Sequence, residues 1–305
     1  MSNNQKGILY AVLTAFLWGF LAILLKVAVQ KVAPQTIVWF RFTVAFVCLL
    51  CWQLIHQPKS LRILIKPPKA LVFAAIALSW NYMGFMLGIQ YTTPSNAQLL
   101  IQTGPILLAL AGVIFFNEKI RKLQLLGFAV ATIGFVFFYS QQIKLMIGHE
   151  GQYNMGVLFT LSGAFAWAMY AILQKRLVFA HTTASLNLFL FGLPALIYLP
   201  FVDFSSLQHL PFIWWLILIV LGLNTLIAYG SLSQALKYTQ ANKVSIILIL
   251  NPMLTFIVMG ILTEIGVSWI EGERFSLPSL LGALIVLSGA ILVVGRRKKQ
   301  ALPSK

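Results

Sequence analysis

Uncharged polar and aromatic side chains recur at helical spacing inside long apolar segments of this chain. Amides, phenols and indoles in such positions donate and accept hydrogen bonds and offer ring faces for stacking. They supply neither a nucleophile nor a metal-ligand set, so the chemistry that they indicate is the binding of a small molecule. The candidate lining residues of one binding site are Trp18, Asn81, Tyr82, Gln98, Gln102, Trp167, Tyr170, Asn224, Tyr229 and Ser231, together with Arg41.

One stripe of these candidates lies on the apolar segment 95–116. Gln98, Gln102 and Pro105 recur at helical spacing, so they share one face of a helix. An amide that faces lipid leaves its hydrogen-bonding groups unsatisfied, which favours a face turned to protein or water. We expect this stripe to line a cavity. For the stripes on segments 70–90 and 212–234, interhelical packing is an equal alternative.

Two tryptophans lie near the centres of apolar segments rather than at their ends. Trp18 is central in segment 7–27, and Trp167 is similarly deep in segment 154–174. Because membrane tryptophans normally lie at the interface with water, this depth favours a role as aromatic walls of a site. The alternative is that both side chains only fill a gap between bent helices.

Charged side chains are scarce in the apolar segments, which narrows the class of bound molecule. No acidic residue precedes Glu118, and none of the six in the chain falls at the centre of an apolar segment. Pumps that exchange cationic drugs for protons usually need a buried carboxylate, so this function is disfavoured. Arg41 lies roughly 10 Å into segment 34–55, at 1.5 Å per residue. Its side chain either binds a substrate carboxylate, extends back to the interface or pairs with a helix end.

The composition identifies the elements that must hold these side chains. The chain has 305 residues, of which 60% are hydrophobic and 9% are charged, and its mean hydropathy is +0.89. This balance predicts an all-α polytopic membrane protein. We expect ten transmembrane helices, near residues 7–27, 34–55, 70–90, 95–116, 122–140, 154–174, 184–202, 212–234, 241–262 and 277–295.

The distribution of basic residues predicts the orientation of these helices. With the N-terminus inside, seventeen Lys and Arg residues fall on the inner side and four on the outer side. Because cytoplasmic loops are rich in Lys and Arg, both termini are predicted to be cytoplasmic. The net charge of +16 is explained in the same way, so we expect no nucleic-acid partner.

Enzymatic activity is the main alternative from another functional class, and the sequence disfavours it. The four histidines are scattered over loops and segment ends, without a nucleophile motif or a cluster of metal ligands. We therefore expect neither a catalytic residue nor a metal or other cofactor.

The chain contains an internal repeat. Residues 15–26 match residues 164–175 at seven of twelve positions, and Pro105 matches Pro252. The repeat divides the chain into a first half, 1–145, a second half, 150–297, and a basic tail, 298–305, predicted to be cytoplasmic. Five helices in each half make the second copy inverted in the membrane, which is a recurring architecture of secondary transporters.

The paired prolines are predicted hinges. Gly104 and Pro105 lie in the middle of one segment, and Pro252 lies in its repeat counterpart. Proline has no N–H group, so we expect the helix to bend and the carbonyls of Ile101 and Leu248 to lack their helical partners. Bends beside a hydrated cavity would let the two halves rock and expose a site to each side in turn.

In combination, these features resemble the EamA-type transporters of the drug/metabolite transporter superfamily. The resemblance rests on the five-plus-five arrangement, the paired tryptophans, Phe40-Arg41-Phe42 with Ala45, and a mid-segment proline followed by a terminal glutamate. It implies a central cavity and the movement of small metabolites such as amino acids, often outward.

We therefore expect a secondary transporter of small neutral or zwitterionic metabolites in a cell membrane, with the bacterial inner membrane as the expected location. Export by alternating access is the expected mode, with lipid as the surroundings and a proton as a candidate coupling ion. A uniporter, a facilitator or a channel-like permease is the alternative, and a cationic drug efflux pump is less favoured.

Overall fold

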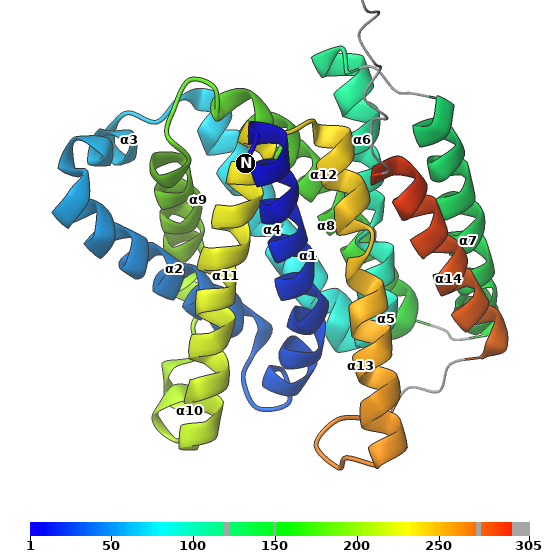
Figure 1. Cartoon of the computed structure of the whole chain (residues 1–305). Helices are drawn as coiled ribbons and strands as arrows, with labels where there is room; N and C mark the ends of the chain where they lie inside the picture. The colour runs from blue at the N-terminus through cyan, green and yellow to red at the C-terminus, as the bar shows by residue number, and fades with distance from the viewer. Residues whose placement is uncertain (119–121, 149–150, 273–275, 295–305) are drawn as a thin grey trace, which may run out of the picture.

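The structure is a computed structural model that describes residues 1–118, 122–148, 151–272 and 276–294, and every regular element in these ranges is a helix (Figure 1). The longer helices are α1 (Asn3–Ala28), α2 (Pro34–His56), α4 (Lys69–Tyr91), α5 (Pro94–Leu100), α6 (Thr103–Phe116), α7 (Lys122–Gly148), α8 (Gln152–Leu177), α9 (Thr183–Tyr198), α11 (Phe212–Tyr238), α12 (Ala241–Leu248), α13 (Asn251–Ile265) and α14 (Leu277–Val294). Short connecting helices are η1 (Pro58–Leu61), α3 (Arg62–Ile65), η2 (Leu199–Phe201) and α10 (Phe204–Gln208).

Eight helical segments of the described residues are long and apolar enough to cross a membrane. They are Asn3–Ala28, Pro34–His56, Lys69–Tyr91, Pro94–Phe116, Gln152–Leu177, Thr183–Phe201, Phe212–Tyr238 and Ala241–Ile265. A shorter apolar stretch, Leu125–Phe137, lies within α7, and α14 covers the last predicted segment. The prediction of an all-α polytopic membrane protein is therefore confirmed, whereas the count of ten crossings stays a prediction.

Local sequence signals mark several helix starts. The Thr93 hydroxyl accepts a hydrogen bond from the N–H of Asn96 at 3.2 Å, and Pro94 occupies the first turn of α5. Thr182 caps α9 in the same way, through the N–H of Ser185 at 3.2 Å. These side chains satisfy N–H groups that the first turn leaves without helical partners, so the helices start where the sequence supplies a cap.

Close helix contacts in the bundle are made at glycines. A Cβ atom on Gly84 of α4 would lie 2.5 Å from the carbonyl oxygen of Phe159 on α8. A Cβ on Gly289 of α14 would lie 2.6 Å from the carbonyl oxygen of Gly127 on α7. Both distances are shorter than van der Waals contact, so these positions require glycine, as is common where membrane helices pack closely.

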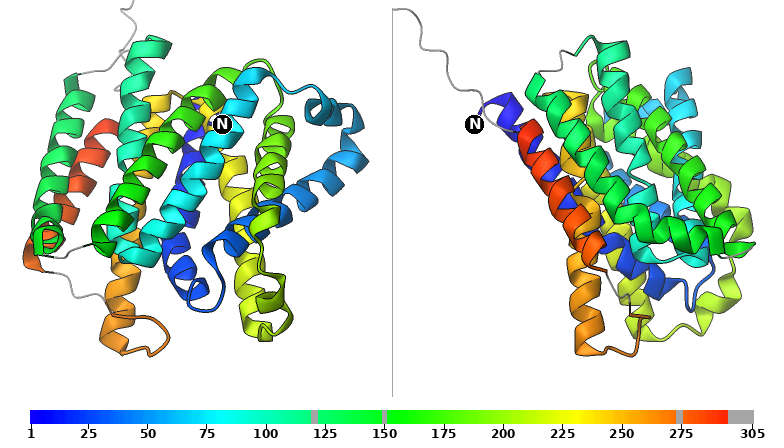
Figure 2. Two further views of the ribbon diagram at one scale, coloured as in Figure 1. Left: turned by 180° about the vertical axis from the view of Figure 1, so that it is seen from behind. Right: turned by 90° about the vertical axis from the view of Figure 1, so that its right-hand side faces the viewer.

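The two halves of the chain are interleaved. α4 packs along α8, and α1 packs along α11, so each of these pairs joins a helix of the first half to a helix of the second. Further cross-half pairs include α2 with α9 and α7 with α14, and the latter pair lies at one edge of the bundle (Figure 2). Neither half therefore forms a bundle of its own.

Two of the membrane-crossing segments are broken at their centres. The first opens at Ile101 and Gln102, between α5 and α6, and the second opens at Ile249 and Leu250, between α12 and α13. The expectation that the Ile101 carbonyl lacks a partner is wrong, because it accepts a hydrogen bond from the N–H of Gly104 at 3.0 Å. A tight turn at the break replaces the helical bond that Pro105 cannot donate.

Candidate binding site

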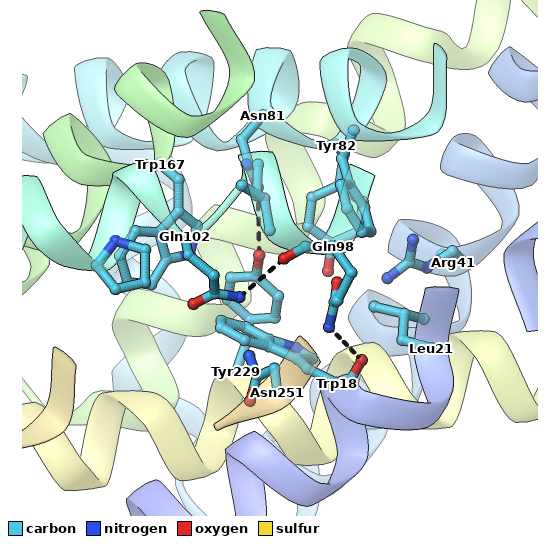
Figure 3. Close-up of a pocket in the computed structure, with 13 residues that line it drawn as sticks. Trp18, Leu21, Arg41, Asn81, Tyr82, Gln98, Gln102, Trp167, Tyr229 and Asn251 are labelled. Atoms are coloured by element: carbon cyan, nitrogen blue, oxygen red, sulfur yellow. Dashed lines mark hydrogen bonds between the residues drawn. The ribbon is translucent and has the colours of Figure 1, made fainter. Parts of the chain in front are cut away.

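A cavity of about 50 Å³ lies where α1, α2, α4, α8 and α11 meet the two broken helices (Figure 3). This volume holds a few water molecules. The cavity is lined by Trp18, Leu21, Arg41, Asn81, Tyr82, Phe85, Gln98, Ile101, Gln102, Pro105, Trp167, Tyr229 and Asn251.

Aromatic rings from equivalent positions of the two halves meet at this cavity. The ring centroids of Trp18 and Trp167 are 6.0 Å apart, at an interplanar angle of 76°. Those of Tyr82 and Tyr229 are 5.5 Å apart, and Trp18 is 5.1 Å from Tyr229. These distances are in the range of favourable aromatic contacts, so the four rings form one continuous wall.

The amide side chains serve packing and lining together. Gln98 donates from Nε2 to the carbonyl oxygen of Trp18 at 2.9 Å, and Asn81 donates from Nδ2 to that of Gly163 at 3.0 Å. Gln102 donates to the carbonyl oxygen of Gln98 at 3.1 Å. The polar stripes allow two interpretations, as cavity lining or as interhelical packing. Both interpretations hold for the same residues, because each side chain borders the cavity while its amide N–H donates to a backbone carbonyl.

Five polar atoms at the cavity are buried and have no hydrogen-bond partner among the described residues. They are the indole Nε1 atoms of Trp18 and Trp167, the hydroxyl of Tyr82, Oε1 of Gln102 and Oδ1 of Asn251. Leaving a buried polar group unpaired costs about 1–3 kcal/mol, so water or a bound molecule is needed to satisfy it. Two N–H donors, one hydroxyl and two oxygen acceptors are thus available to a bound molecule.

Arg41 is the only charged side chain in the described lining, and it is 2% exposed. Its Nε donates to the hydroxyl of Thr225 at 3.1 Å, and its Cζ lies 4.4 Å from the ring centroid of Tyr82. A cation over an aromatic face is stabilised by about 0.5–2 kcal/mol. The guanidinium is therefore held in place by neutral groups.

Eight of the eleven predicted substrate-binding residues line this cavity, and three do not. Tyr170 is fully buried, with its ring 5.8 Å from that of Tyr229. Asn224 donates to the carbonyl oxygen of Leu17 at 2.9 Å, and Ser231 is buried on α11. These three residues lie outside the lining and contribute to helix packing.

The predicted hinge residues lie in different surroundings. Pro105 lines the cavity, whereas Gly104 contacts α8, where a Cβ atom would lie 2.9 Å from Ala164 and from Trp167. Pro252 borders a smaller, wholly apolar cavity instead.

Sequence reasoning missed four lining residues, Leu21, Phe85, Ile101 and Asn251. Asn251 is the repeat counterpart of Gly104, so the repeat itself carried a signal for it. The other three are aliphatic or aromatic and look like the rest of their helices in the sequence.

Two lysines, Lys26, which is half-buried, and Lys175, which is buried, cap helix ends on opposite sides of the cavity. Lys26 donates from Nζ to the carbonyl oxygens of Ile89 and Thr92, at 3.1 and 3.0 Å, at the end of α4. Lys175 donates to those of Leu236 and Thr239, at 2.7 and 2.6 Å, at the end of α11. A cation at a helix C-terminus satisfies its last carbonyls and the helix dipole. We call these two regions the Lys26 end and the Lys175 end.

The Lys175 end carries a second connection, through Glu118. Oε1 of Glu118, after α6, accepts from the N–H of Ala241 at 2.7 Å, and Oε2 accepts from that of Asn242 at 3.1 Å. This carboxylate caps the start of α12 and also attracts Lys175. Glu264, its counterpart in the repeat, is exposed and accepts no hydrogen bond from the part of the chain that the structure describes.

The comparisons with known proteins agree with this architecture. The sequence profile of the EamA-like transporter family matches residues 5–140 and 154–295. An uncharacterized transporter of Haemophilus influenzae is 32% identical over 289 residues, covering 94% of each chain. An uncharacterized inner membrane transporter of Escherichia coli is 29% identical, covering 95% of this chain and 92% of its own.

Two further similarities concern a named activity and the fold. A protein of Escherichia coli named as a probable amino-acid metabolite efflux pump is 24% identical over 319 residues, covering 98% of each chain. A solved crystal structure superposes with a TM-score of 0.71 at 18% identity, over 94% of this chain and 96% of its own. This last similarity concerns the fold alone.

Proposed function

Because this chain belongs to the EamA-like transporter family, we propose that it is a secondary transporter of small neutral or zwitterionic metabolites of amino-acid type. The chain is a membrane transporter and not an enzyme. The observation that carries the proposed substrate class is the cavity between the halves, with its aromatic wall and five unpartnered polar atoms.

The composition of the lining supports this class of solute. Rings of Trp and Tyr stack on an apolar side chain, at about 0.5–1.5 kcal/mol per contact beyond area burial. Indole N–H groups and amide oxygens match the acceptors and donors of a small polar solute. No carboxylate lines the cavity among the described residues, so a permanent cation finds no counter-charge there.

The mechanism proposed is alternating access about this cavity. The contacts of the two halves correspond, since α4 with α8 has its counterpart in α1 with α11, which supports ten crossings in two inverted repeats. The breaks in the two proline-containing segments provide places where helices change direction. The solute would enter from one end while the other is closed.

Export is the proposed direction. One relative is named a probable amino-acid metabolite efflux pump, and another is named an inner membrane transporter. The excess of basic residues on one side favours cytoplasmic termini and an inner-membrane location. Cysteine labelling should find residues 59–69 inside and Glu271 outside; a C-terminus found outside would contradict both the orientation and the inverted repeat.

Transport by the purified protein in liposomes tests the proposal. Liposomes loaded with phenylalanine or leucine should take up labelled solute by exchange, and empty liposomes should not. Transport of permanent cations alone, or of polyanionic phosphate esters alone, would contradict the proposed class of solute.

Facilitated diffusion without a coupling ion is the second candidate. It is favoured by the absence of any acidic or histidine side chain from the described lining, which leaves no evident proton site. An imposed pH gradient distinguishes the two: concentrative transport supports proton coupling, and equilibration alone supports a facilitator.

A further inference from the structure

Arg41 carries a buried positive charge that has no counter-ion among the residues that the structure describes. Of the described acidic residues, Glu118 caps α12, Asp203 caps the short helix α10, and Glu264 and Glu271 are exposed. None of these carboxylates forms an ion pair with Arg41. A buried ion is stable only when its charge is paired and its hydrogen-bonding groups are satisfied.

The neutral partners of Arg41 hold its side chain through one hydrogen bond and one aromatic contact. A guanidinium has five N–H groups, and the hydroxyl of Thr225 accepts one of them, at Nε. Cζ of the guanidinium lies 4.4 Å from the centroid of the Tyr82 ring. The planar guanidinium of arginine can bind a carboxylate with two parallel hydrogen bonds.

The second half of the chain shows that this position does not need a charge for folding. The corresponding region contains Asn187, whose Oδ1 accepts from Ser233 at 2.8 Å and from Gln174 at 3.3 Å. Asn187 is therefore occupied by neighbouring helices and does not line the cavity. Equivalent helix packing is achieved without a cation there, whereas Arg41 faces the cavity.

From these observations, and resting on the proposed transport function, we infer that Arg41 binds a carboxylate of the solute. The solute is therefore a carboxylic acid, and it enters the cavity in one orientation. Figure 3 shows Arg41 on one side of the lining and Gln102 on the other. The unpartnered oxygens of Gln102 and Asn251 remain available to accept hydrogen bonds from N–H donors of the solute.

Binding of matched solutes to the purified full-length protein tests this assignment. The probes are phenylalanine, its amide and its decarboxylated amine, together with the same three forms of leucine. Fluorescence of Trp18 and Trp167 reports binding because both rings line the cavity. We expect the wild type to bind each acid about 10- to 100-fold more tightly than its amide or amine.

Variants then assign this preference to one side chain. Arg41→Met should bind acid and amide equally, and Arg41→Lys should keep part of the preference because it retains the charge without the planar edge. Lys175→Met is the matched control, since Lys175 is a buried cation outside the lining and its loss should leave the preference unchanged.

Thermal unfolding without solute separates binding from a structural role. Removing an uncompensated buried charge should leave Arg41→Met as stable as the wild type or more stable, whereas removing a structural partner lowers the melting temperature. A stability loss, an Arg41→Met variant that still prefers acids, or a wild type that binds amides as tightly would each overturn the assignment. In these cases the proposed transport function stands, whereas failure of all six solutes to bind contradicts that function as well.

Discussion

The Lys26 end and the Lys175 end are built from residues at equivalent positions of the repeat, yet the cavity is lined from the Lys26 end. At the Lys26 end, Leu21, Phe85, Gln98 and Ile101 line it. Their repeat counterparts at the Lys175 end are Tyr170, Leu232, Ser245 and Leu248, and all four are fully buried in packed helices. The repeat therefore predicts which residues occupy equivalent positions. It does not predict which of the two equivalent sets lines the cavity.

Electrostatic connections follow the same asymmetry. Both ends have a lysine that caps a helix, and among the described residues the Lys175 end alone has a carboxylate bound to the next helix start, through Glu118. Under the proposed alternating access, an exchange of the conformations of the halves would bring Glu264 toward the start of α5 and release Glu118. On this hypothesis, closure at either end depends on one carboxylate, and four experiments test it.

The largest expected contrast comes from filling equivalent positions at the two ends. Ile101→Trp places a large ring in the cavity and should reduce transport to the background of empty liposomes, with little loss of stability. Leu248→Trp overpacks a closed region and should destabilise the protein by about 1–3 kcal/mol. Transport assays and thermal unfolding measure the two effects. Equal stability losses would mean that the ends are packed alike.

Removal of the capping lysines comes next. Lys175→Met leaves the carbonyls of Leu236 and Thr239 unpaired and should cost about 2–3 kcal/mol of unfolding free energy. Lys26→Met should cost less, because Lys26 is half-buried and water can replace it. Chemical unfolding of both variants gives the comparison, and a larger loss for Lys26→Met would reverse it.

Replacement of Glu118 should open the Lys175 end, whereas replacement of Glu264 should not. Glu118→Gln removes the charge from the two hydrogen bonds of this side chain. This loss costs about 1 kcal/mol and shifts the equilibrium between the closed and open forms of the Lys175 end about fivefold toward the open form. Glu264→Gln should not open that end. The labelling rate of Ser245→Cys, with Cys48 and Cys51 replaced by alanine, reports the opening. An unchanged rate in Glu118→Gln would show that its carboxylate does not hold the end closed.

The prolines should give the smallest effects. Pro105→Ala and Pro252→Ala restore N–H donors at the two breaks, so we expect a few-fold slower turnover with folding and binding intact. Transport normalised to folded protein is the measurement. A wild-type rate in both variants would show that the prolines only shape helix packing.

Much of this architecture could be predicted from the sequence, because the length and hydrophobicity of a segment indicate whether it forms a membrane helix. The contacts between Trp18 and Trp167, and between Tyr82 and Tyr229, join residues that the repeat had already paired. The exclusion of Tyr170 and the inclusion of Phe85 were not predictable. Helical spacing shows which residues share a face, whereas the conformational state decides which of two equivalent faces borders a cavity.

The carbonyl of Ile101 shows a second limit of sequence reasoning. The missing donor of Pro105 was evident, but the bond from Gly104 depends on a tight turn that the backbone forms at the break. Local geometry of this kind follows from the surrounding packing rather than from residue type.

The glycine contact between α4 and α8 also has a consequence for biogenesis. The tight face of α4 is complete only when α8 is present, and about sixty residues of chain separate the two helices. During synthesis, α4 is therefore inserted before α8 has been made. Until then its glycine face contacts lipid or the insertion machinery. A fragment that ends before α8 should accordingly be unable to assemble, and co-expression of the missing half should rescue it.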